Sequence, residues 1–113
     1  MSDKIDVRKV LLQQLMDESP DYIFIKDRQS RFVITNKAHA QSLLGLKNPE
    51  EAIGKTDFDL FPDKPDDSQR FYDEEQSIME TGQPVIHREW TVPSTTTGEL
   101  VWLSESKLPI RAE

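Results

Sequence analysis

The chain has 113 residues, with 21 acidic against 14 basic side chains and a formal net charge of −7. This length fits one domain with a single core, and the negative charge argues against nucleic acid or an anionic membrane as a partner. The absence of cysteine excludes disulfides, thiolate zinc sites, thiol nucleophiles and thioether-linked haem. A charged N-terminus and the lack of a long apolar run predict a soluble, cytoplasmic segment with no membrane-spanning part.

The first 18 residues have the apolar spacing of a helix that ends at a proline. Ile5, Leu12 and Leu15 fall on one seam, and other apolar residues lie beside it. A helix that is apolar on more than one side needs two neighbours. We therefore expect residues 1–18 to be a flanking dimerisation helix, with Ile5, Leu12 and Leu15 in the homodimer contact.

Residues 21–36 predict a hairpin, because two runs of β-branched and aromatic residues flank a polar turn. Asn36 is suited to cap a short helix, which Gly45 ends in the left-handed conformation. A second helical piece begins after Asn48 and ends at Gly54.

The stretch EAIGKTDFDLFPDK, residues 51–64, mixes acids with large apolar groups. Thr56 and Asp59 have the spacing of a capping box, and Phe58 and Phe61 share a face and are expected to be buried together. The glycine and alternating oxygen ligands of a calcium loop are missing. We therefore interpret the acidic run as caps and solvated turn residues, and not as catalytic or metal-binding groups: Asp57, Asp59, Asp63, Asp66 and Asp67.

A longer helix is predicted to open at Asp66, which forms a capping-box pattern with Gln69. It runs to about Thr81, and Gly82 terminates it. From Pro84 onward, two runs of β character flank a loop of threonines and glycine, which predicts a second and longer hairpin.

In order and spacing these segments resemble the PAS domain, the small α+β sensory module of signalling proteins. PDYIFIKD and RFVITN look like its first two strands, and NKA looks like its strand-to-helix junction. LLGL, EEAIGKTDFDLFP, METGQPVI and WLSESKLPIR are similar to a PAS subgroup common in bacterial sensor histidine kinases and diguanylate cyclases.

The resemblance covers residues 18 to 111 and implies an antiparallel five-stranded sheet, in spatial order 2-1-5-4-3, with helices on one face enclosing a pocket. The fifth strand of the family has no counterpart here. Residues 19–113 are therefore expected to be a C-terminally truncated PAS domain cut from a larger receptor. Open strand edges would lower its stability or favour dimerisation.

The resemblance also bears on cofactors. Haem-binding PAS domains commonly carry the proximal histidine on the long helix, and residues 66–82 contain none, so haem is disfavoured. We interpret His39 and His87 as structural or surface residues, although His39 could still face the pocket. Cysteinyl-flavin photochemistry is excluded, a loosely held flavin is not, and no cofactor is identified.

Alternation on the last strand places Ser104 and Ser106 on one face with Trp102. Two small hydroxyls beside a large ring would leave room for a mostly apolar ligand and would anchor it; the alternative is that this face meets solvent or a packed ring. The predicted pocket residues are Ile23, Ile25, Phe32, Ile34, Leu43, Phe58, Phe61, Phe71, Ile78, Trp102, Ser104 and Ser106.

We expect a non-catalytic sensory module that binds a small ligand or mediates dimerisation and regulates a linked output domain, in the first place a histidine kinase and otherwise a diguanylate cyclase. One alternative is a structural PAS spacer or protein-interaction module with a filled core. Another is an enzyme built on the acidic run. A pocket and a packed core use the same residue types, so the sequence leaves the first two open.

Overall fold

The computed structural model describes residues 6–93 and 98–110, apart from several side chains of the second hairpin. Those side chains belong to His87, Trp90, Val92, Pro93, Leu100, Val101, Trp102, Leu103 and Ser104. In chain order the elements are α1 (Val7–Glu18), β1 (Phe24–Lys26), β2 (Phe32–Thr35), the π-helix η1 (His39–Leu43), the 3-10 helix η2 (Pro49–Ala52), α2 (Asp57–Leu60), α3 (Pro65–Thr81), β3 (Val85–Pro93) and β4 (Leu100–Lys107).

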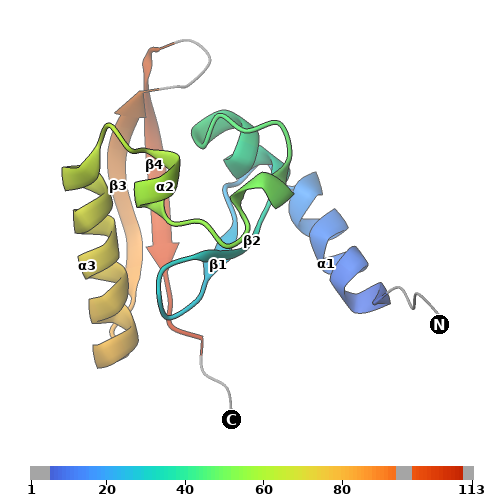
Figure 1. The fold of residues 1–113 in the computed structure, drawn as a ribbon, viewed down its shortest axis with the longest axis horizontal. Helices are drawn as coiled ribbons and strands as arrows, with labels where there is room; N and C mark the ends of the chain where they lie inside the picture. Colours follow the sequence, from blue (N-terminus) through green and yellow to red (C-terminus); the bar gives the residue numbers. More distant parts are fainter. Residues whose placement is uncertain (1–5, 94–97, 111–113) are drawn as a thin grey trace.

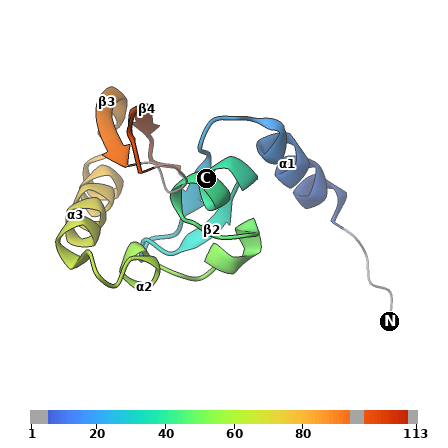
Figure 2. The ribbon, with the colours of Figure 1, turned by 90° about the horizontal axis from the view of Figure 1, so that it is seen from above.

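This order confirms the predicted α+β arrangement of a hairpin, several helices and a longer hairpin. Figures 1 and 2 show the β3–β4 hairpin together with α3 at one end of the molecule and α1 at the other, with β1 and β2 between them. Among the described residues, no helix is both long and apolar enough to cross a lipid bilayer.

The first hairpin contains a bulge that changes which side chains share a face. Ile25 lies opposite Ile34, whereas Lys26 lies opposite Phe32, so β2 carries one extra residue, Val33. Such a bulge interrupts the regular alternation of the strand. Phe32 and Ile34, both predicted to line one pocket, therefore fall on different faces.

The junction after β2 is built around Asn36, whose side chain is fully buried. Its Nδ2 atom donates to the carbonyl oxygens of Met16 and Asp21, at 2.7 Å each. Its Oδ1 atom accepts from the backbone N–H groups of Ile23 and His39, at 3.1 Å each. The bond to His39 confirms the predicted cap, and the other three tie the end of α1 and the start of β1 to the same side chain.

The capping box before α2 is confirmed, because Asp59 N donates to Thr56 Oγ1 at 3.3 Å and Thr56 N donates to Asp59 Oδ2 at 3.0 Å. The one predicted for α3 is wrong. That helix begins at Pro65, whose missing N–H suits a first helical position. The Gln69 side chain donates to Asp73 at 2.8 Å instead of capping the helix.

The helix end is as expected, since Gly82 follows α3 with a φ of 72°. The second hairpin then pairs β3 with β4 in antiparallel register, with Arg88 opposite Glu105. In the parts of the chain that the structure describes, the strands form two separate two-stranded sheets, β1-β2 and β3-β4. The edges of β1 and β4 that face a fifth strand in the family therefore have no hydrogen-bonded strand neighbour among these elements.

The main core lies beneath the first hairpin. Phe32, Leu44 and Ala52 are buried together, and Phe24 and Phe61 pack against them from neighbouring segments. This cluster joins β2 to η2 and forms one side of the cavity described below.

Candidate ligand-binding cavity

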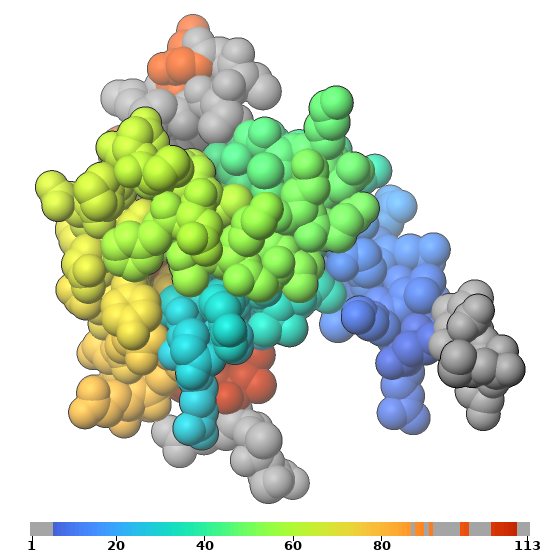
Figure 3. All heavy atoms as spheres, in the orientation of Figure 1, coloured from blue at the N-terminus to red at the C-terminus, as the bar shows by residue number. Residues whose placement is uncertain are grey.

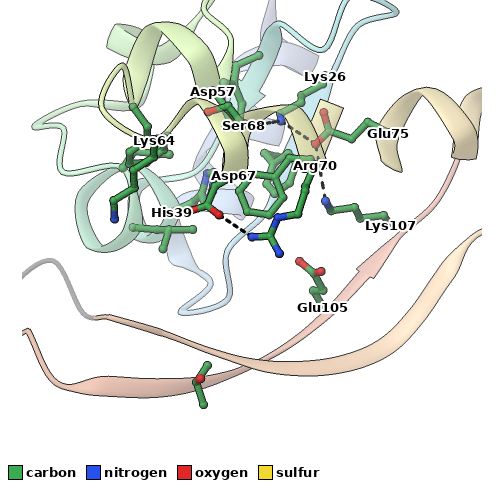
Figure 4. Close-up of a pocket in the computed structure, with 17 residues that line it drawn as sticks. Lys26, His39, Asp57, Lys64, Asp67, Ser68, Arg70, Glu75, Glu105 and Lys107 are labelled. Carbon is green, nitrogen blue, oxygen red and sulfur yellow. Dashed lines mark hydrogen bonds and ion pairs between the residues drawn. The ribbon is translucent and has the colours of Figure 1, made fainter. Parts of the chain in front are cut away.

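A cavity of about 630 Å³ lies between the first hairpin, the helices and the second hairpin. Its wall includes residues of β1, β2, η1, α2, α3, β3 and β4 (Figure 4). Figure 3 shows that, on the face it displays, side chains of the helices cover this region. The volume is within the range that holds a small organic molecule.

One side of the cavity is aromatic. The ring of Phe24 stacks on His39 at a centroid distance of 4.7 Å and an interplanar angle of 22°. Phe32 meets Phe24 edge-on at 5.6 Å. Together with Phe61 and Phe71 on the helical side, these rings offer flat apolar surfaces. A planar apolar body could bind there by stacking and burial.

His39 is a buried part of this wall, with an exposed fraction of 3%. Its Nδ1 atom lies 2.7 Å from Thr35 Oγ1, a hydrogen bond that holds the ring in place. Burial, and secondarily the positive charge of Lys26, lower the pKa of His39 to about 4. The imidazole is therefore neutral at physiological pH, which agrees with the structural role expected for it.

The other side of the cavity is charged. Lys26 Nζ lies 2.7 Å from Asp57 Oδ2 and 2.7 Å from Glu75 Oε2, and its side chain is only 8% exposed. The same ammonium is 4.8 Å from the centroid of the Phe32 ring and 5.5 Å from that of Phe24. Lys26 thus joins the aromatic and charged sides of the cavity, because it contacts both.

Further ion pairs connect this lysine to the second hairpin. Lys107 Nζ lies 2.9 Å from Glu74 Oε1 and 3.7 Å from Glu75 Oε2. Arg88 pairs with both Glu74 and Glu105, and these bonds raise its pKa. Hydrogen bonds from Arg88 and Lys107 lower the pKa of Glu74 to about 2.

Glu75 is bonded unevenly in this network. Its Oε2 atom receives both lysines, whereas its Oε1 atom is buried and has no hydrogen-bond partner among the described residues. A buried polar atom left in this way costs about 1–3 kcal/mol. A further donor that reached Glu75 Oε1 would therefore be bound favourably.

A family model described as the PAS fold matches residues 16–113. The chain belongs to the PAS family. PAS domains are sensory and signalling modules and not enzymes, so the expectation of a non-catalytic module is confirmed at that level. A comparison with curated protein sequences finds no significant match.

Solved structures of VqmA are similar to this PAS domain. A Vibrio cholerae VqmA dimer without target DNA, described as a LuxR-type receptor, is 27% identical, with a TM-score of 0.71 over 96% of this chain and 45% of that one. VqmA bound to DPO is 30% identical, with a TM-score of 0.72 over 94% and 50%. A Vibrio cholerae complex of VqmA with ligand and DNA is 28% identical, with a TM-score of 0.74 over 98% and 46%.

The PAS domain therefore spans about half the length of these receptors. The expectation that nucleic acid is not a partner finds no support in them, because one was solved with DNA. That expectation rested on the net charge of this segment, which says nothing about other parts of a longer receptor.

The structure places the predicted pocket residues unevenly. Four line the cavity: Phe32, Leu43, Phe61 and Phe71. Six described ones do not: Ile23, Ile25, Ile34, Phe58, Ile78 and Ser106. The side chains of Trp102 and Ser104 lie outside the described part of the chain.

Physical reasons explain these differences. On β1 the cavity face carries Phe24 and Lys26, so Ile23 and Ile25 belong to the opposite face. The bulge moves Ile34 to that opposite face, paired with Ile25. Ile78 is buried without reaching the cavity wall.

Phe58 is 36% exposed and contacts Tyr72 at a ring distance of 6.4 Å, so it is not buried together with Phe61. Ser106 is exposed. The short α2 ends at Leu60, and the backbone of Phe61, at the C-cap, is no longer helical. The two phenylalanines therefore do not share a helix face.

Sequence reasoning missed Phe24, Lys26 and the role of Asp57. Asp57 is predicted to be a cap or a solvated turn residue; it lies in the first turn of α2, but its side chain is only 13% exposed and pairs with Lys26. The available signal was the alternation in FIK, which places Lys26 on the same strand face as Phe24. His87 has no described side chain, and the described residues hold no cluster of three or more His, Asp or Glu groups arranged for a metal.

Proposed function

We propose that this PAS domain is the ligand-binding module of a longer bacterial signalling receptor, and that it regulates a covalently linked output domain. The observation that carries this is the cavity itself, which combines aromatic surfaces with charged groups, of which Lys26, Asp57 and Glu75 are mostly buried. Sites for small molecules are usually built in this way. The VqmA structure bound to DPO supports the proposal.

The output domain is proposed to be DNA-binding, as in the LuxR-type receptors to which the chain is similar. The histidine kinase expected from the sequence is the second candidate, since the PAS subgroup signature points to it. The same proposal places the boundary between a flanking helix and the PAS domain at residues 18 and 19. It also includes a cytoplasmic location. An output assay on the full receptor, with a DNA-binding readout and a phosphorylation readout, separates the two.

The ligand-binding proposal is tested by mass spectrometry under native and then denaturing conditions, followed by titration with DPO. A mass that disappears on denaturation, or a saturable DPO signal, would support it. Leu43→Trp should fill the cavity and abolish binding, whereas Val33→Trp, on the exposed side of β2, should retain it. A clean mass and no DPO signal would instead favour the structural spacer with a filled core.

We also propose that α1 forms a homodimer contact. Leu12 and Leu15, two of the predicted seam residues, are 45% and 72% exposed; Ile5 lies outside the described residues. Further exposed apolar residues on the same helix are Val7, Val10 and Leu11. Within its own domain, α1 buries only one of its apolar residues, Met16. A second copy of the chain would bury the remaining apolar surface of the helix.

The double variant Leu12→Glu/Leu15→Glu should be monomeric at micromolar concentration in sedimentation equilibrium. Lys47→Glu, at an exposed lysine outside α1, is the matched charge control and should stay dimeric. Persistence of dimers in the double variant would refute a contact through this face.

A further inference from the structure

Lys26 lies where it could bind a ligand in the cavity and pass the effect of binding to the helices and the second hairpin. It lies against the Phe24 and Phe32 rings and bonds to two carboxylates, one on α2 and one on α3. An ammonium has three N–H donors, and Asp57 and Glu75 receive two of them. The third N–H is therefore open to an acceptor atom on a molecule stacked against the Phe24 and Phe32 rings.

The charges around the cavity are balanced, and this limits the ligand. Four cationic and four anionic side chains line it: Lys26, Lys64, Arg70 and Lys107 against Asp57, Asp67, Glu75 and Glu105. An anionic ligand would compete with Asp57 and Glu75 for Lys26 and would leave a buried carboxylate without its partner, which is strongly unfavourable. A neutral acceptor, such as a carbonyl oxygen or a ring nitrogen, adds no charge, so every carboxylate keeps a cationic partner even when Glu75 exchanges Lys26 for Lys107.

Glu75 is placed to change partners when Lys26 does. Its bonded oxygen is 2.7 Å from Lys26 and 3.7 Å from Lys107, and its second oxygen is buried without a partner. If Lys26 turns toward a ligand, Glu75 gains by moving closer to Lys107 on β4. Lys107 in turn bonds to Glu74, which holds Arg88 on β3.

We infer that the ligand is a small neutral molecule with a flat apolar body and a hydrogen-bond acceptor, and that this acceptor binds Lys26. Glu75 then shifts from Lys26 to Lys107, and this shift moves the β3–β4 hairpin. This rests on the proposed ligand-binding function of the cavity. The hairpin can respond because it meets α3 through these ion pairs, with Arg88 and Lys107 both bonded to Glu74. Figure 4 shows the line of residues from Lys26 through Glu75 to Lys107.

The test uses three ring probes of similar size in NMR titrations of the labelled chain: toluene, with no acceptor; acetophenone, with a neutral acceptor; and benzoate, with a negative charge. Acetophenone should bind about tenfold more tightly than either other probe, the effect of one hydrogen bond to a charged donor. It should shift the side-chain signal of Lys26 and the amide signals of Arg88, Glu105 and Lys107. Toluene should shift signals from the aromatic side alone.

Lys26→Met should abolish the preference for acetophenone, whereas Lys47→Met, at an exposed lysine outside the cavity, should keep it. If Lys26→Met does not fold, the Lys26 signal of the wild type still decides the question. Equal affinities for the three probes, tighter binding of benzoate, or hairpin shifts that toluene also produces would overturn this inference. The proposed ligand-binding function would still stand. Failure of all three probes to enter the cavity would overturn the ligand-binding function with it.

Discussion

Replacing Asn36 by alanine should destabilise the domain far more than a typical polar substitution. Asn36 is fully buried, and its side chain makes four hydrogen bonds to the backbone, two donated and two accepted. Alanine can make none of them. Carbonyl oxygens at Met16 and Asp21, and N–H groups at Ile23 and His39, would lose this partner.

A loss of roughly 1 kcal/mol for each bond gives about 3–5 kcal/mol in the free energy of unfolding. Since domains of this size are stable by about 5–15 kcal/mol, this is a large part of the total. At about 4–5 °C per kcal/mol, the midpoint of thermal unfolding should fall by about 12–25 °C. Because the bonds to Met16 and Asp21 hold the end of α1, that helix should also show faster amide exchange.

The assay is urea denaturation followed by circular dichroism, with thermal melts in parallel. Asn48→Ala is the matched control, because Asn48 is exposed and precedes η2; its loss should cost about 1 kcal/mol or less. Asn36→Asp should also destabilise the domain, since a carboxylate keeps the two accepted bonds but cannot donate. A loss below about 1 kcal/mol for Asn36→Ala would refute the additive reasoning, because the four bonds would then contribute almost nothing net.

Three further outcomes are expected. Since the pKa of His39 is about 4 in the folded chain and 6.5 in its ordinary state, the unfolded chain binds the proton first, and stability is lost as pH falls from about 6.5 to 4; relative to His39→Phe, the wild type should lose about 2–3 kcal/mol over that range, and parallel curves in urea titrations at pH 7 and 4 would contradict this. The pKa of Glu74 is lowered from 4.5 to about 2, so its stabilising effect is present above pH 4.5 and is lost as pH falls toward 2; Glu74→Gln should flatten this acid limb of the unfolding curve, and an unchanged limb would show that the network with Arg88 is not formed in solution. Gly82→Ala should lower the free energy of unfolding by about 1 kcal/mol, because alanine is strained at a φ of 72°. An unchanged thermal midpoint would mean that α3 ends in a different conformation.

Features that depend on neighbouring residues could be predicted from the sequence. The Thr56 and Asp59 capping box and the glycine end of α3 involve residues a few positions apart, and both are present. The cap of α3 was predicted wrongly because the local sequence offers two possible helix starts, Pro65 and Asp66. Pro65 opens α3 one residue before Asp66, because a proline at the first helical position needs no partner for its nitrogen.

The cavity could be predicted only in part. Leu43 and Phe71 follow from helical position, but the polar side of the cavity depends on pairing between residues far apart in the chain. Lys26 meets Asp57 and Glu75, and neither partner is indicated by local sequence pattern. Alternation also assumes an unbroken strand, so the extra residue in β2 could not be anticipated and led to the wrong face for Ile34.

The bulge in β2 also has an evolutionary consequence. Deleting Val33 would restore a regular ladder, and each remaining residue of β2 would keep its partner on β1 and therefore its face. The bulge thus absorbs one extra residue without disturbing the cavity lining, whereas a slip of one residue in a strand without a bulge would move its side chains to the other face as a block. Among relatives of this chain, differences in ligand preference should accordingly follow the identity of the lining residues more closely than one-residue differences in the length of β2.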